Sequence, residues 1–182
     1  LWVIGSDKAT ESTIEESFKN LIRLLDKHLE TRPYIFGKTP SIADFALSGQ
    51  IYNANNDVTA RELIQKNTPK LNDWIERMLS PRHMGDFEEW RELKPTLLPL
   101  IKEEIAQVFL PWVTANNNAV ENNKEELSIM IKGRTFAHKV TSVQNFHTKS
   151  FRLLMENYQT ASHHEELEDV LTETGVKEYL NA

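Results

Sequence analysis

The stretch PYIFGKTPSIADFALSGQIY, Pro33 to Tyr52, decides the fold prediction because it joins a turn to an unusually apolar helix. Glycine and proline punctuate its first half, which is typical of a turn. In its second half, Ser41 stands three residues before Asp44. This is the spacing of a capping box, in which each side chain satisfies a backbone N–H of the other residue. We therefore expect Ser41 and Asp44 to form the structural cap of a helix.

The helix behind this cap carries apolar residues on nearly every side. They are Ile42, Ala43, Phe45, Ala46, Leu47, Gly49, Ile51 and Tyr52. A helix that is apolar all round is expected to have partners on every side. The sequence therefore predicts a central core helix that is buried on all its faces.

The rest of the chain is mostly helical in pattern. Apolar residues at helical spacing predict further helices over residues 12–30, 58–66, 68–79, 87–93 and 96–120. Ser12 with Glu15 has the spacing of a second capping box, and Thr68 before Pro69 marks another helix start. Three prolines are expected to start or bend helical turns: Pro95, Pro99 and Pro111.

The hydrophobic period changes late in the chain. Leu127, Ile129 and Ile131 alternate with Ser128, Met130 and Lys132, and Lys132-Gly133 stands where a two-residue turn would lie. This pattern predicts a β-hairpin of residues 127–131 and 134–140. Two more helices are expected, over residues 141–158 and 162–175. The predicted fold class is all-α with one small late hairpin.

Composition excludes several classes of function. The 182 residues carry a net charge of -6, so no basic field attracts nucleic acid. No apolar run approaches the roughly 18 residues of a membrane span, so no membrane partner is expected. The chain has no cysteine, which removes thiolate nucleophiles and thiolate metal ligands. These features fit a cytoplasmic protein.

No motif of the chain predicts a metal or a catalytic residue. His163 and His164 precede a run of acidic residues, but no third ligand follows at a useful spacing. Asp44 is engaged by its cap, and Ser41 has no base near it in the sequence. We expect no metal site and no catalytic residue.

Two segments resemble a known family. RPYIFGKTPSIADFALSGQI and TPKLNDWIERM are similar to the all-helical C-terminal domain of glutathione transferases, and the resemblance covers residues 10–79. VFLPWVTANNNAV and the hairpin after it resemble a bacterial subgroup with an extended C-terminus. The resemblance implies a glutathione-transferase-type helical bundle over residues 1–120. It also implies an extension over residues 121–182, a hairpin plus two helices, packed on that bundle.

The resemblance implies a function that needs a second domain. In this family an upstream thioredoxin-like domain binds glutathione and activates its thiol, and residues 1–10 are too short to hold it. We expect the chain alone to bind no glutathione and to be inactive, while the intact protein is a glutathione-dependent transferase and forms a homodimer. Apolar surface should remain where the upstream domain docks, near Trp2, Val3, Ile4 and Ile14. The alternative is a non-catalytic helical docking module.

The helical domain of the family lines the site of an apolar co-substrate. Phe109, Trp112 and Asn116 fall at helical spacing and are the candidates for this pocket. The other interpretation places Phe109 and Trp112 in the core and has Asn116 cap a bend. The sequence favours the second interpretation but leaves the first open.

Overall fold

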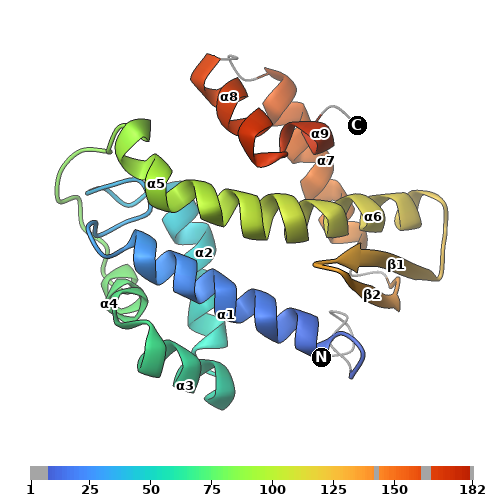
Figure 1. Ribbon diagram of the computed structural model, residues 1–182, viewed down its shortest axis with the longest axis horizontal. Coiled ribbons are helices and arrows are strands. Elements are labelled where there is room, and N and C mark those ends of the chain that lie inside the picture. The colour runs from blue at the N-terminus through green and yellow to red at the C-terminus, as the bar shows by residue number, and fades with distance from the viewer. Residues whose placement is uncertain (1–7, 142–143, 161–164, 181–182) are drawn as a thin grey trace. The chain divides into compact units, whose positions relative to one another are not determined.

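The structure is a computed structural model that describes residues 8–141, 144–160 and 165–180. Helices dominate these residues, and one antiparallel hairpin accompanies them (Figure 1). In chain order the elements are α1 (Glu11–His28), α2 (Ile42–Ala54), α3 (Val58–Asn67), α4 (Pro69–Met78), α5 (Trp90–Leu100), the π-helix η2 (Ile101–Phe109), α6 (Leu110–Glu121), β1 (Glu126–Ile131), β2 (Arg134–Lys139), α7 (Gln144–Thr160), α8 (Glu165–Thr174) and α9 (Lys177–Leu180). The predicted class, all-α with a small late hairpin, is confirmed.

The chain divides into two compact units. We call residues 18–100 the helical unit, and residues 1–17 together with 101–182 the hairpin unit. The family-type domain of residues 1–120 and the extension of residues 121–182 stay predictions. Among the described residues, no helix is both long enough and apolar enough to cross a bilayer.

Within the helical unit, helix α4 contacts both α2 and α3. Its apolar residues Leu71, Trp74 and Ile75 recur at the spacing that puts them on one face, and all three are buried. They pack within the buried apolar set of this unit: Ile22, Leu24, Leu25, Leu29, Tyr34, Ile35, Ile51, Ile64, Leu93 and Leu97. An amphipathic helix of ten residues is therefore held by its packing and not by its length.

The start of α4 is capped from another helix. Thr68 occupies the N-cap position, but its hydroxyl donates to the Ile64 carbonyl at 2.7 Å and makes no bond to α4. The carboxylate of Asp26, on α1, instead accepts from the backbone N–H groups of Lys70 at 2.7 Å and Leu71 at 3.0 Å. This carboxylate satisfies donors that a helix start leaves open, so it fastens α1 to α4.

Two predicted helix starts were wrong. Helix α1 begins at Glu11, so Ser12 lies inside the helix and not at its cap. The helix predicted from Phe87 begins at Trp90. Residues before Trp90 are held in a different way, because Phe87 forms an isolated β-bridge with Gly37 and the Glu88 N–H donates to the Phe36 carbonyl.

The three prolines flank a long π-helical segment. Pro95 and Pro99 lie inside α5, Pro111 lies in the first turn of α6, and η2 runs between them. Proline has no N–H to donate and therefore leaves carbonyls upstream of it without a helical partner. Wider turns are one way in which a helix absorbs such an interruption.

In the hairpin unit, β1 pairs with β2, and α6 contacts both β1 and α7. Lys132 and Gly133 form the turn with φ of 48° and 78°, the two left-handed residues of a type I′ turn. The predicted hairpin is confirmed. Helices α6, α7 and α9 and the π-helix share the core of this unit, whose buried residues are Ala106, Leu110, Val113, Phe151, Val176 and Leu180.

Candidate functional site

Asp44, in the first turn of α2, is a fully buried carboxylate that holds four donors. Its Oδ2 accepts from the Ser41 N–H at 2.9 Å and from the Ser41 hydroxyl at 2.6 Å. Its Oδ1 accepts from the Ile35 N–H at 2.9 Å and from Trp74 Nε1 at 3.0 Å. The Asp44 N–H points to the Ser41 hydroxyl at 3.4 Å, which completes a capping box. Each carboxylate oxygen has two donors, so Asp44 serves structure and not proton transfer.

The face of α2 opposite Asp44 is apolar and exposed. Ile42 is 87% exposed, Phe45 is 55% exposed and Tyr52 is 45% exposed. Ala46 and Gly49 lie between them on the same helical face and are also exposed. A Cβ placed on Gly49 would meet no atom within 4 Å. We call these five residues the α2 face.

The α2 face corrects the prediction of a helix buried on every side. Only Asp44 and Ile51 of α2 are buried, and the helix contacts α4 on that side. The all-round apolar pattern predicts a partner for each face, but the described residues supply a partner for one face alone. Large exposed apolar surfaces of this kind mark interaction sites. The α2 face is therefore the candidate functional site.

The three predicted pocket residues do not line either cavity that we describe below, and they differ in environment. Phe109, at the end of η2, is 44% exposed. Trp112 is half-buried and donates from Nε1 to His138 Nε2 at 3.1 Å. The Trp112 ring stacks on the His138 ring at a centroid distance of 6.2 Å and meets the His147 ring edge-on at 5.0 Å. Trp112 thus contacts aromatic rings of both β2 and α7.

Asn116 is fully buried in the hairpin unit. Its Nδ2 donates to the Gln144 carbonyl at 3.2 Å and to the Thr148 hydroxyl at 3.3 Å. Asn116 therefore ties α6 to the first turn of α7. A contact of these three residues with a co-substrate stays a prediction.

A second polar cluster of the hairpin unit surrounds Glu104 of the π-helix. Its Oε2 accepts from the Ser17 hydroxyl at 2.5 Å, and its Oε1 pairs with Lys132 Nζ at 2.7 Å. Glu104 is 8% exposed, and buried acids are usually paired in this way. The cluster joins the hairpin turn to α1 and explains why the acid can lie on the inner side of the π-helix.

His28, at the end of α1, is fully buried in the helical unit and lies in a polar network. Its Nε2 donates to the Ile35 carbonyl at 2.7 Å, and its Nδ1 accepts from the Thr96 hydroxyl at 2.8 Å and from Arg32 Nη1 at 3.1 Å. Burial lowers the pKa of His28 below its ordinary 6.5, and the Arg32 charge lowers it further. The Ile35 carbonyl and the carboxylates of Glu88 and Asp44 oppose this shift. A neutral imidazole fits these contacts, because Nδ1 faces donors.

Two further predictions concern a metal site and the apolar surface near the start of the chain. Among the described residues, no three histidine, aspartate or glutamate side chains gather to hold a metal ion. His163 and His164 lie outside the described residues, and so do Trp2, Val3 and Ile4. Ile14 is 36% exposed, less than any of the three large apolar side chains of the α2 face.

Comparison with known families agrees with this part of the structure. Residues 9–77, which include the whole α2 face, match the family model of the glutathione S-transferase C-terminal domain. No curated protein and no solved structure matches the chain significantly.

Proposed function

We propose that the chain is the co-substrate-binding part of a glutathione-dependent transferase, because residues 9–77 match the family model of the glutathione S-transferase C-terminal domain. In this proposal a thioredoxin-like domain encoded upstream binds glutathione and holds its thiolate. Domains of the family usually pair with such a domain and dimerise. We place the protein in the cytoplasm as a homodimer.

The observation that carries the proposal is the α2 face. It lies within residues 9–77, which match the family model, and its large side chains are exposed in the structure. Interfaces between two domains of one chain typically bury about 600–1,500 Å². An exposed helix face with Ile42, Phe45 and Tyr52 supplies the apolar centre of such an interface. The small Ala46 and Gly49 between them let another backbone approach closely.

We propose a division of chemistry between the two domains. In this proposal the thioredoxin-like domain forms the thiolate. The helical domain would then contribute by holding an apolar electrophile next to the thiolate, which raises the rate through proximity and orientation. Phe109, which is 44% exposed, would contact such a ligand, and the hydrogen bonds of Trp112 and Asn116 would hold α6 in place.

The test compares the chain with the longer polypeptide that its complete reading frame encodes. Glutathione conjugation to a chlorinated nitroaromatic compound is followed by absorbance. We expect activity from the longer protein and none from the chain alone. Phe45→Glu in the longer protein should lower the activity, because it puts a charge into the domain interface. The matched control is Leu79→Glu, which changes another exposed apolar side chain of the helical unit, at the end of α4.

Two results would contradict the proposal. Conjugation by the chain alone would show that the chemistry lies in these residues. A longer protein that is inactive, but whose α2 face binds another protein, would favour the non-catalytic docking module.

A further inference from the structure

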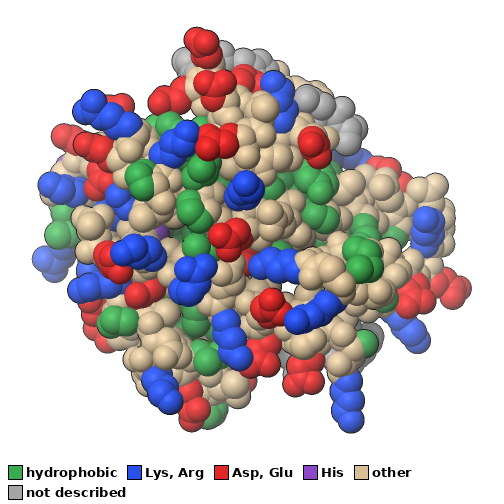
Figure 2. All heavy atoms as spheres, in the orientation of Figure 1, with side chains coloured by type: hydrophobic (Ala, Val, Ile, Leu, Met, Phe, Trp, Pro, Cys, Tyr) green, Lys and Arg blue, Asp and Glu red, His purple; other side chains and the backbone are tan. Residues whose placement is uncertain are grey.

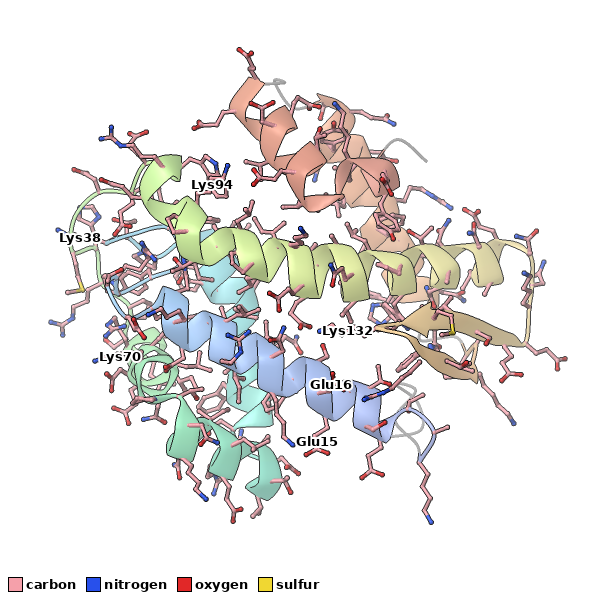
Figure 3. All side chains as sticks on the ribbon, viewed as in Figure 1. Glu15, Glu16, Lys38, Lys70, Lys94 and Lys132 are labelled. Carbon is pink, nitrogen blue, oxygen red and sulfur yellow. The ribbon has the colours of Figure 1, made fainter. Side chains whose placement is uncertain are left out.

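A cavity of about 500 Å³ opens in the helical unit, and neither the α2 face nor the three predicted pocket residues line it. The end of α1 and the turn after it form one wall, and one face of α4 forms the other. Its lining residues are Leu29, Glu30, Thr31, Arg32, Pro33, Lys38, Lys70, Asp73, Arg77 and Met84. Figure 3 shows Lys38 and Lys70 on the same side of this unit. Cavities of this size hold small organic ligands.

Arg77 is the cation best placed to hold such a ligand. Its Nη1 donates to the Pro33 carbonyl at 2.9 Å, and its guanidinium carbon lies 5.9 Å from the centre of the Tyr34 ring. These two contacts orient the guanidinium, but neither neutralises it. In the part of the chain that the structure describes, no carboxylate forms a salt bridge with Arg77. A guanidinium has five N–H donors, so most of those of Arg77 remain available.

The other cations of the cavity differ in how far they are neutralised. The Lys38 ammonium has no acidic partner among the described residues, and its stem passes the Cα of Gly85. Lys70 lies 3.7 Å from Asp73, a loose pair between half-exposed side chains. Arg32 is fully engaged by contrast, since its Nε donates to Glu88 at 2.8 Å, its Nη1 bonds the His28 network and its Nη2 donates to the Glu92 carbonyl at 3.1 Å.

The acids of the cavity do not cancel these charges. Glu30 is bound to Lys27 at 2.6 Å, and Asp73 faces Lys70. Lys38 and Arg77 therefore leave positive charge in the cavity, although the chain as a whole carries -6. On the face seen in Figure 2, cations and acids are interspersed. The cavity differs from that surface in its charge, because two of its cations are not neutralised by an acid.

A second hollow of about 320 Å³ continues from the first, because Arg77 and Met84 line both. Tyr34, Glu76, Ser80 and Arg82 complete it. Arg77 thus stands where the two hollows join. Pro33 and Met84 offer apolar surface beside it, which suits the body of a ligand whose charged end is held by Arg77.

We propose that this double cavity binds a small organic anion, a phosphate or carboxylate head with a short apolar body. Arg77 would receive the head through paired N–H donors, the geometry that suits both kinds of head. Lys38 and Lys70 add positive charge around it. The site is distinct from the co-substrate pocket of the proposed function, and it can be tested in the chain alone.

Hexyl phosphate is the probe, titrated calorimetrically into the full chain, with inorganic phosphate and hexanol as partial ligands. We expect hexyl phosphate to bind more tightly than either. Arg77→Gln and Lys38→Gln should each weaken it by about tenfold, which corresponds to about 1.4 kcal/mol. The control is Lys66→Gln, which removes an equal charge from α3, outside the cavity. It should leave the affinity within about twofold, since only distant, screened charge is lost.

Amide chemical shifts locate the bound probe. We expect the largest changes in residues 31–38 and 70–77. Lys38→Gln keeps the test valid if Arg77→Gln unfolds, because the Lys38 ammonium forms no hydrogen bond or salt bridge with the residues that the structure describes. Three results would overturn the proposal: equal affinity for hexanol, equal weakening by Lys66→Gln, or shifts centred on the α2 face.

Discussion

The Asp44 carboxylate accepts a hydrogen bond from Trp74 Nε1 at 3.0 Å, although the two residues stand 30 positions apart. Both are fully buried. The cap of α2 is therefore also a link to the centre of α4. The same carboxylate oxygen accepts from the Ile35 N–H, so the turn before α2 is fixed at this point as well.

Asp44→Ala should lower the free energy of unfolding by about 3–5 kcal/mol, because it leaves the donors of Ile35, Ser41 and Trp74 buried without an acceptor. A cap alone contributes about 1 kcal/mol. Denaturant unfolding measures the difference. The control is Asp57→Ala, which removes an exposed cap whose carboxylate accepts only from Thr59 and Ala60. A loss at Asp44 no larger than that at Asp57 would contradict the tertiary role.

His28 should make the protein less stable in mild acid. Its folded pKa lies below the ordinary 6.5 because of burial and the Arg32 charge, so the unfolded chain binds a proton more readily than the folded chain. The contribution of His28 to stability is complete above pH 6.5 and is lost as the pH falls through the lowered folded pKa. Urea unfolding between about pH 8 and pH 5 should show this decline. His28→Gln should flatten it, and an unchanged slope would exclude His28 as the cause.

Local patterns predicted local structure well. The two residues of the Lys132-Gly133 turn and the alternation of Leu127, Ile129 and Ile131 depend on near neighbours, and the hairpin forms where they indicate. The cap of α4 shows the limit of this reasoning. Thr68 has the residue type of a cap, but Asp26 performs the role, and no local pattern brings α1 to α4.

Sequence reasoning was also limited at the candidate site. The apolar pattern of α2 predicts an apolar partner for both faces of the helix, but it does not indicate which of those partners belong to the same folded unit. Lys38 and Arg77 are likewise unremarkable in the sequence, because a cavity depends on how the turn after α1 approaches α4. The sequence offered one signal for this cavity. Lys70 and Arg77 stand at positions i and i+7 of an amphipathic helix, and a turn lies close to that helix.

Two glycines should respond oppositely to alanine. Gly133 has φ of 78°, where a side chain costs about 1–2 kcal/mol, so Gly133→Ala should destabilise the hairpin. Gly49 lies inside α2 with open space around it, so Gly49→Ala should raise the free energy of unfolding by about 0.5–1 kcal/mol. Thermal or denaturant melts of the two variants measure both signs. A destabilising Gly49→Ala would mean that another part of the chain covers the α2 face.

The α2 face should make the chain alone self-associate or bind a hydrophobic dye. Its large side chains are more than two fifths exposed, and contiguous apolar patches above a few hundred Å² are uncommon on monomers. The double variant Ile42→Lys with Phe45→Lys should abolish both behaviours. It should change the free energy of unfolding by no more than about 0.5 kcal/mol, because neither side chain is part of the core.

Sedimentation and dye fluorescence read out association, and denaturant melts read out stability. Leu79→Lys with Val58→Lys is the matched control, because it replaces two other exposed apolar side chains of the helical unit. If this control lowers association as much as the α2 variant does, general surface hydrophobicity is responsible. If the α2 variant instead unfolds the protein, Ile42 and Phe45 are buried in solution and the face already has its partner. Loss of association in the α2 variant alone, with stability kept, is the result expected of a docking face for a second domain.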